Sequence, residues 1–209
     1  MPEFPIDTST IPTFFLGVYR DTLVRNTSKV LELARNPERL WPHIKTYKSS
    51  RMAGFLLSHG IARFKCATIG EARLLARAGA REVLLAYPLI EPAVRSVAAL
   101  KSRYRATDFS IIADNIRQVE ELETVFSGDE GGGINVFLDV DVGQQRTGVK
   151  PDDRALSLYK RIDESPNLTV AGLHAYDGHN HQQDRTERDN AAEECYQTAT
   201  DLRQRLISE

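Results

Sequence analysis

Cysteine and long apolar runs are scarce in this chain. Its 209 residues hold two cysteines, Cys66 and Cys195, which lie far apart and form no CxxC pair. Neither a disulfide framework nor a thiolate zinc site is therefore indicated. No stretch reaches the roughly 18 apolar residues of a membrane span, and the first residues show no charged segment followed by a long apolar run. We predict a cytoplasmic protein with no membrane partner.

An excess of charge of one sign is also missing. The chain carries 27 lysines and arginines against 29 aspartates and glutamates, a net charge of -2. Its basic residues are scattered and form no stripe interleaved with aromatic side chains, so nucleic acid is not expected as a ligand. With 41% hydrophobic and 27% charged residues, the composition is ordinary for a globular protein.

Strand and helix signals alternate along the chain, which is typical of a parallel sheet built from right-handed βαβ units. Short apolar runs predict the strands, and apolar residues at helical spacing predict the helices. The expected strands are residues 13–19, 40–45, 63–66, 83–87, 109–113, 134–140 and 168–175. The expected helices are residues 21–35, 51–59, 71–78, 92–104, 116–126, 152–162 and 187–206.

The alternation fits either a doubly wound sheet or a barrel. A doubly wound sheet that binds a dinucleotide has GxGxxG in its first strand–helix turn, and the corresponding residues 19–22 read YRDT. We therefore predict a (β/α)₈ TIM barrel. About seven units are recognisable where a closed barrel needs eight, so we expect the barrel to be incomplete, as one domain over residues 1–209.

Candidate catalytic residues follow the strands, because barrel enzymes carry their chemistry at the carboxyl ends of the strands. Lys45 closes the second expected strand, two residues after His43. A lysine that loses solvent there has a depressed pKa and can form a Schiff base with an aldehyde, although an ordinary surface lysine fits the same pattern. The sixth strand leads to Arg146 and the seventh to Tyr176. Together these ends supply an amine, a guanidinium, an imidazole and a phenol.

Two further groups of polar residues leave their roles open. Asp139 and Asp141 alternate on one strand, so they fit an acid/base pair or metal site as well as solvated carboxylates that pair with a lysine. Three histidines at positions 174, 179 and 181 lie within eight residues, but their spacing matches no compact zinc pattern. We therefore assign no residue to a metal.

Five motifs in this order resemble those of a known family. They are WPHIKTYK at residues 41–48, CATIGEA at 66–72, LLAYP at 84–88, DVDVGQQRTG at 139–148 and YDGH at 176–179. The set is similar to the pyridoxal-phosphate barrels of the D-threonine aldolase and D-serine dehydratase group. That group has the alanine racemase N-terminal fold type.

The resemblance implies roles for four residues. Lys45 would carry pyridoxal 5'-phosphate as an internal aldimine and later act as a base. Arg146 would approach the phenolic oxygen of the pyridoxal ring, and Tyr176 would lie near the ring nitrogen or the substrate. His43 would shape the pocket beneath the ring. Thr68 and Tyr87 are expected only as wall residues.

The function that the resemblance implies is a pyridoxal-phosphate-dependent lyase acting on D-β-hydroxy amino acids, as an aldolase or dehydratase. An amino-acid racemase on the same barrel and a non-catalytic pyridoxal-phosphate binding or homeostasis protein are the alternatives. The sequence departs from the family at Tyr47, where Lys-Thr-His-Lys is common. Members of the group carry a divalent metal on a C-terminal β-domain and are commonly homodimers at full length. We expect the 209-residue chain to lack that domain and to be weakly active or inactive alone.

Overall fold

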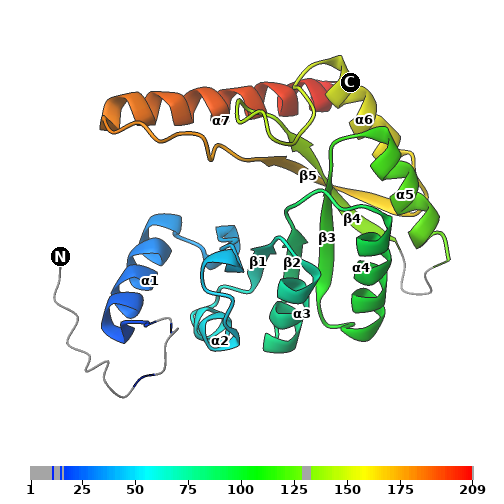
Figure 1. The fold of residues 1–209 in the computed structure, drawn as a ribbon. Helices are drawn as coiled ribbons and strands as arrows, with labels where there is room; N and C mark the ends of the chain where they lie inside the picture. Colours follow the sequence, from blue (N-terminus) through cyan, green and yellow to red (C-terminus); the bar gives the residue numbers. More distant parts are fainter. Residues whose placement is uncertain (1–10, 12–14, 16, 129–132, 209) are drawn as a thin grey trace.

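A five-stranded parallel sheet forms the centre of the protein in the computed structural model, which describes residues 11, 15, 17–128 and 133–208 (Figure 1). The strand order β1-β2-β3-β4-β5 follows the sequence without reversal. A doubly wound sheet reverses its order at a switch point, whereas barrel strands add consecutively. The strand order thus confirms the predicted barrel type. The strands are β1 (Arg63–Cys66), β2 (Glu82–Leu85), β3 (Asp108–Ala113), β4 (Ile134–Val140) and β5 (Leu168–Ala175).

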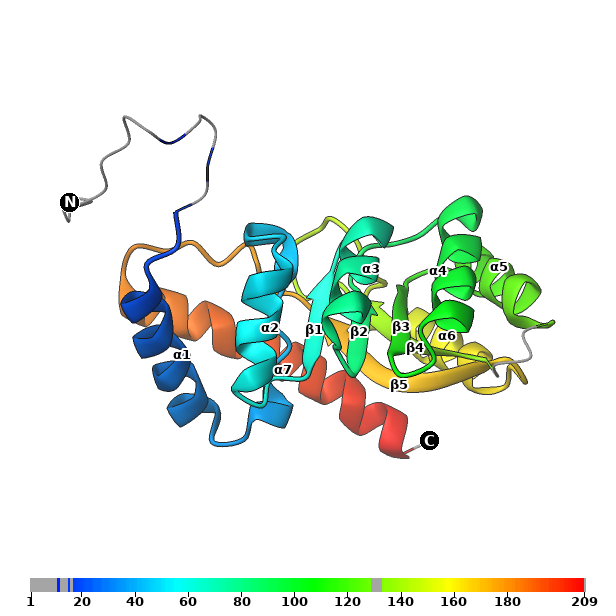
Figure 2. The ribbon, with the colours of Figure 1, turned by 90° about the horizontal axis from the view of Figure 1, so that it is seen from below.

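Helices alternate with these strands, and Figure 2 shows α3 and α4 on one side of the strands and α7 on the other. Helices α1 and α2 lie beyond the β1 end of the sheet, and α7 contacts β5 and α6 at the other end. None of the helices in the described part of the chain is long and apolar enough to cross a membrane. The helices are α1 (Arg20–Ala34), α2 (Ser50–Ser58), α3 (Ile69–Ala78), α4 (Glu91–Arg103), α5 (Ile116–Phe126), α6 (Asp153–Asp163) and α7 (Arg185–Ser208), with short 3₁₀ helices at Pro37–Arg39 and Ile44–Thr46.

Polar caps set where the helices begin after the strands. Thr68 Oγ1 accepts the backbone N–H of Glu71 at 3.2 Å, and Glu71 Oε2 accepts the N–H of Ala67 at 2.8 Å, a variant of the capping box at the start of α3. Asn115 and Gln118 repeat the arrangement at α5. These reciprocal bonds satisfy donors that a helix end leaves unpaired, so each strand leads sharply into its helix.

Two of the seven expected strands differ in the structure. Residues 13–19 lie partly outside the described residues, and the described Gly17–Tyr19 form no strand before α1. Residues 40–45 form a single bridge, His43 to Lys65, and the chain then turns into the 3₁₀ helix at Ile44. The apolar run at residues 40–44 resembled a strand, but Pro42 donates no ladder hydrogen bond and the tight turn ends the pairing.

The two faces of the sheet differ in character. Side chains such as Phe64, Cys66 and Leu85, all 0% exposed, point into the core beneath the helices. Because successive side chains on a strand alternate, Lys65 and Asp139 point to the opposite face, the interior of the barrel. This inner face also carries Leu84, Ser110, Ile112, Asn135, Phe137 and His174. The interior therefore mixes charged and apolar groups.

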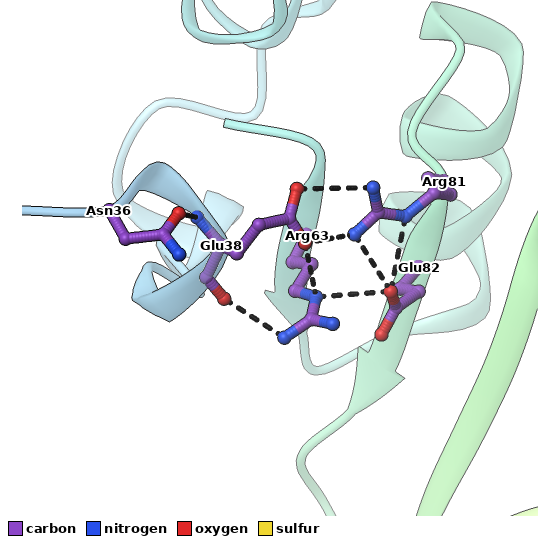
Figure 3. Close-up of polar contacts among 5 residues, drawn as sticks. All are labelled: Asn36, Glu38, Arg63, Arg81 and Glu82. Atoms are coloured by element: carbon purple, nitrogen blue, oxygen red, sulfur yellow. Dashed lines mark hydrogen bonds and ion pairs between the residues drawn. The ribbon is translucent and has the colours of Figure 1, made fainter. Parts of the chain in front are cut away.

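An ionic network ties the amino ends of β1 and β2 to the segment before Trp41 (Figure 3). Arg63 Nε lies 3.0 Å from Glu82 Oε1 and 3.3 Å from Glu38 Oε2, and Arg81 pairs with both carboxylates. The pKa of Glu38 is lowered, first by its hydrogen bond from Arg81. The amino end of a barrel stabilises the fold, so we assign this network a structural role and place the chemistry at the opposite end.

Candidate functional site

The residues that carry Lys45 are fixed by backbone contacts with β1. The N–H of Lys65 donates to the carbonyl of Pro42 at 3.0 Å, next to the bridge from His43. His43 Nδ1 then accepts the backbone N–H of Lys45 at 3.1 Å and caps the 3₁₀ turn. Lys45 is exposed, so the expected loss of solvent at its amine does not occur in this structure. The amine is instead freely accessible at the carboxyl edge of the sheet.

Three side chains that are distant in sequence meet at this edge. Lys45 Nζ lies 5.8 Å from the ring centroid of Tyr176, and the Arg146 guanidinium lies 5.3 Å from the same centroid. Tyr176 follows β5, Arg146 lies in the loop after β4, and Lys45 precedes β1. An amine, a guanidinium and an aromatic ring therefore converge at this edge.

One layer deeper, a buried pair lies on the inner face of the sheet. His174 Nδ1 is 2.6 Å from Asp139 Oδ1, with the side chains 8% and 4% exposed. His174 precedes Tyr176 by two residues. Side chains two positions apart on a strand point to the same face, so His174 faces the interior, farther than Tyr176 from the carboxyl edge of the sheet. The second oxygen, Asp139 Oδ2, is buried and has no hydrogen-bond partner among the described residues. Asp139 is thus neither a solvated carboxylate nor half of an aspartate pair.

Charged groups at the carboxyl edge and in the interior both affect the pKa of His43. Its pKa is lowered, first by burial and then by the positive charge of Lys45, and Lys65 and His174 act in the same direction while Glu71 opposes them. Burial and nearby cations both disfavour the imidazolium. His43 therefore favours its neutral form, consistent with the hydrogen bond that its Nδ1 accepts from Lys45.

The loop that presents Arg146 is held by Asp141 and Gly148. Asp141 Oδ1 accepts the N–H groups of Gly143 at 3.0 Å and Gln145 at 2.9 Å. Gly148 has φ +99°, and a Cβ there would lie 2.5 Å from the backbone nitrogen of Asp141. Only glycine fits this close approach. Asp141 therefore shapes the loop, and it does not share a site with Asp139.

Glu71 anchors the other end of the lysine segment to α3. Its Oε1 lies 3.2 Å from Lys48 Nζ, and its side chain is 5% exposed. Burial by itself raises the pKa of Glu71, but the bonds from the Ala67 N–H and from Lys48 outweigh it, so the pKa is lowered overall. Between Lys45 and Lys48, Tyr47 is half-buried, and burial raises its pKa to about 12. The phenol therefore stays protonated at neutral pH.

Substituting Glu71→Gln should reduce the free energy of unfolding by about 1 kcal/mol at neutral pH, because the amide keeps a backbone acceptor but loses the ion pair with Lys48. The lowered pKa makes the carboxylate's contribution complete above its unfolded value of 4.5, and the contribution is lost as pH falls through the folded value. Urea unfolding at pH 7 and pH 3 checks both effects. If the free energies of unfolding of the unvaried chain and Glu71→Gln differ by the same amount at pH 7 and at pH 3, the prediction is wrong.

The remaining predicted residues are less central. Thr68 caps α3, and Tyr87 is exposed beyond β2. His179 Nε2 lies 3.8 Å from Cys195 Sγ, away from the His174 pair. In the part of the chain that the structure describes, no three histidine, cysteine, aspartate or glutamate side chains group as a metal site.

Sequence reasoning missed two interior features, the Asp139–His174 pair and Lys65. Lys65 is half-buried on β1 between the core residues Phe64 and Cys66. Its alternation with these two residues was the available signal, because a charged side chain between two core positions must face the other side of the strand. The pairing of Asp139 with His174 depends on the register of β4 with β5, which aligns these two residues and which the sequence does not show.

The chain is similar to known proteins. Residues 18–209 match the family model described as "Alanine racemase, N-terminal domain". The chain is 31% identical over 166 residues to a D-threonine aldolase of Arthrobacter sp, covering 79% of this chain and 42% of the relative. It is 29% identical over 181 residues to a 3-hydroxy-D-aspartate aldolase of Paracoccus denitrificans, covering 85% and 46%.

A solved structure supports the same fold. The crystal structure of D-threonine aldolase from Filomicrobium marinum superposes with a TM-score of 0.83 at 27% identity, over 90% of this chain and 51% of that chain. The chain therefore spans about half the length of the relatives that it matches.

Proposed function

Because the chain belongs to the alanine racemase N-terminal domain family, we propose that it binds pyridoxal phosphate through Lys45 and belongs to a lyase that acts on D-β-hydroxy amino acids. The observation that carries the proposal is the convergence of Lys45 and Arg146 on the ring of Tyr176. The relatives named as a D-threonine aldolase and a 3-hydroxy-D-aspartate aldolase support the lyase class.

The side chains at the edge fit the cofactor chemically. An accessible primary amine can react with an aldehyde, a guanidinium can pair with a phenolate oxygen, and an aromatic ring supplies a flat apolar surface. Lys45, Arg146 and Tyr176 provide these three groups within 6 Å of one ring centroid. When bound, pyridoxal phosphate would withdraw electrons from the bonds at Cα of an attached amino acid.

The chain's own residues would position and deprotonate the substrate. Lys45 would hold or move the proton at Cα of a bound substrate, and the neutral His43, whose Nδ1 accepts the Lys45 N–H, would keep a further positive charge away from its amine. Arg146 would hold an oxygen anion, and Tyr176 would lie over the reacting groups as a wall. These roles assign proton movement to Lys45 and orientation to Arg146 and Tyr176.

The other expectations from the family resemblance belong to the same proposal. They are a homodimer at full length, a divalent metal in the full-length protein and a cytoplasmic location. An amino-acid racemase is the second candidate function, because removal of the Cα proton needs only Lys45 and the cofactor. A non-catalytic pyridoxal-phosphate carrier is the third.

Product identification separates these candidates. The chain, supplied with pyridoxal phosphate and a divalent cation, is incubated with D-threonine, D-serine and each enantiomer of alanine. A lyase releases glycine and an aldehyde from D-threonine, or an oxo acid and ammonia from D-serine. We expect one of these product pairs. Formation of the opposite enantiomer without cleavage would favour the racemase, and binding with no product would favour the carrier.

A further inference from the structure

Lys65 is a second amine, on β1, whose charge acts on His43, the residue that caps the turn of Lys45. It alternates on β1 with Phe64 and Cys66, which are both 0% exposed beneath the helices, so its side chain faces the interior. A parallel bridge joins its residue to His43, and His43 Nδ1 accepts the backbone N–H of Lys45. Lys65 therefore lies one layer beneath the candidate cofactor site.

This amine has no bonded counter-ion. Among the described residues, neither a hydrogen bond nor an ion pair reaches the side-chain amine of Lys65, although the charges of Asp139 and Asp177 raise its pKa. Burial lowers the pKa more strongly, so the net shift is downward. Asp139 is already hydrogen-bonded to His174 at 2.6 Å. A half-buried ammonium without a partner is costly, and an incoming anion would relieve that cost.

The cations Lys45 and Arg146 both lie near the Tyr176 ring, and both have roles in the proposed function. Lys45 would be used for covalent attachment of the cofactor, and Arg146, which lies over Tyr176, would pair with an oxygen of the ring. Lys65 remains. Every amino acid substrate carries at least one carboxylate. The ammonium group of Lys65 would therefore pair with a carboxylate of the substrate.

We propose that Lys65 is a specificity-determining residue that binds a carboxylate of the substrate in the barrel interior. The proposal rests on the proposed function, since it takes the substrate to be an amino acid. The carboxylate has two sources, the α-carboxylate common to all amino acids and the side-chain carboxylate of an acidic substrate. A relative of this chain is named for 3-hydroxy-D-aspartate, which carries both.

Binding of D-malate tests the proposal without turnover. D-malate has two carboxylates and a hydroxyl group but no amine, so it cannot displace Lys45 from the cofactor. Isothermal titration of the chain loaded with pyridoxal phosphate should show D-malate binding that weakens by about tenfold to a hundredfold in Lys65→Met, the effect of losing a hydrogen bond to a charged group. Titration with D-lactate, which has one carboxylate, distinguishes the sources. Weakening of both ligands identifies the common carboxylate, and weakening of D-malate alone identifies the side-chain carboxylate.

Two controls separate a binding role from a structural one. Lys29→Met removes an exposed lysine on α1 that pairs with Glu32, and it should leave D-malate binding unchanged. Lys65→Cys treated with bromoethylamine regenerates a side chain with an amine at nearly the same length. Because the native cysteines Cys66 and Cys195 are buried, the reagent should act at position 65, and D-malate binding should return.

Failure of this inference differs from failure of the proposed function. If the unvaried chain attaches the cofactor at Lys45 but does not bind D-malate, or binds it equally well in Lys65→Met, the carboxylate role of Lys65 is wrong. Weaker pyridoxal phosphate binding in Lys65→Met with unchanged D-malate binding would also overturn it, because Lys65 would then serve the cofactor phosphate. If the unvaried chain attaches no cofactor, the proposed function itself is wrong.

Discussion

Substituting Lys45→Ala should abolish covalent attachment of pyridoxal phosphate and lower turnover by at least about 10³-fold. The reason is chemical, because alanine offers no amine to the aldehyde of the cofactor or to the Cα proton. The visible absorbance that follows addition of pyridoxal phosphate, together with product formation from D-threonine, measures the change.

The control for this prediction is Lys29→Ala on the exposed surface of α1. It removes the same functional group far from the edge where Tyr176 lies, so absorbance and product formation should match those of the unvaried chain. A Lys45→Ala chain that still develops the full absorbance would show that another lysine carries the cofactor.

The second large effect concerns stability. Substituting Asp139→Leu should reduce the free energy of unfolding by about 3 kcal/mol, because it leaves the buried imidazole of His174 without its partner at 2.6 Å. Asp139→Asn retains an oxygen acceptor for Nδ1 and should cost only about 1 kcal/mol. Urea unfolding of the three chains gives the values.

A double substitution tests whether the loss of stability comes from the unpaired His174. Asp139→Leu combined with His174→Leu replaces the whole pair by apolar groups, so stability should recover part of the loss of the single variant. If Asp139→Leu alone is as stable as the unvaried chain, the two side chains do not depend on each other.

The barrel type was predictable from the sequence because it depends on local patterns. Alternating strand and helix patterns predicted β1 to β5 and their helices, and the missing glycine motif at residues 19–22 favoured the barrel. The motif resemblance marked Lys45, Arg146 and Tyr176, which the structure brings to one edge. These features depend on residue types and short spacings.

The features that could not be predicted depend on tertiary contacts. The apolar run at residues 40–45 looked like a strand, but its pairing with β1 is limited to one bridge at His43, which left Lys45 exposed on a 3₁₀ turn. The partner of Asp139 is fixed by the register of β4 with β5, which includes an irregularity at Val136/Phe137. Hydrophobic patterning does not encode such a shift, because it changes the pairing without changing the composition of the strands.

The most direct test of the central claim is to locate the cofactor on the unvaried chain. The chain is incubated with pyridoxal phosphate, reduced with borohydride, digested and mapped by mass spectrometry. We expect the added mass on the peptide that contains Lys45, in a stoichiometry of about one per chain. Scattered modification of exposed lysines, or a single modification at a lysine other than Lys45, would contradict it.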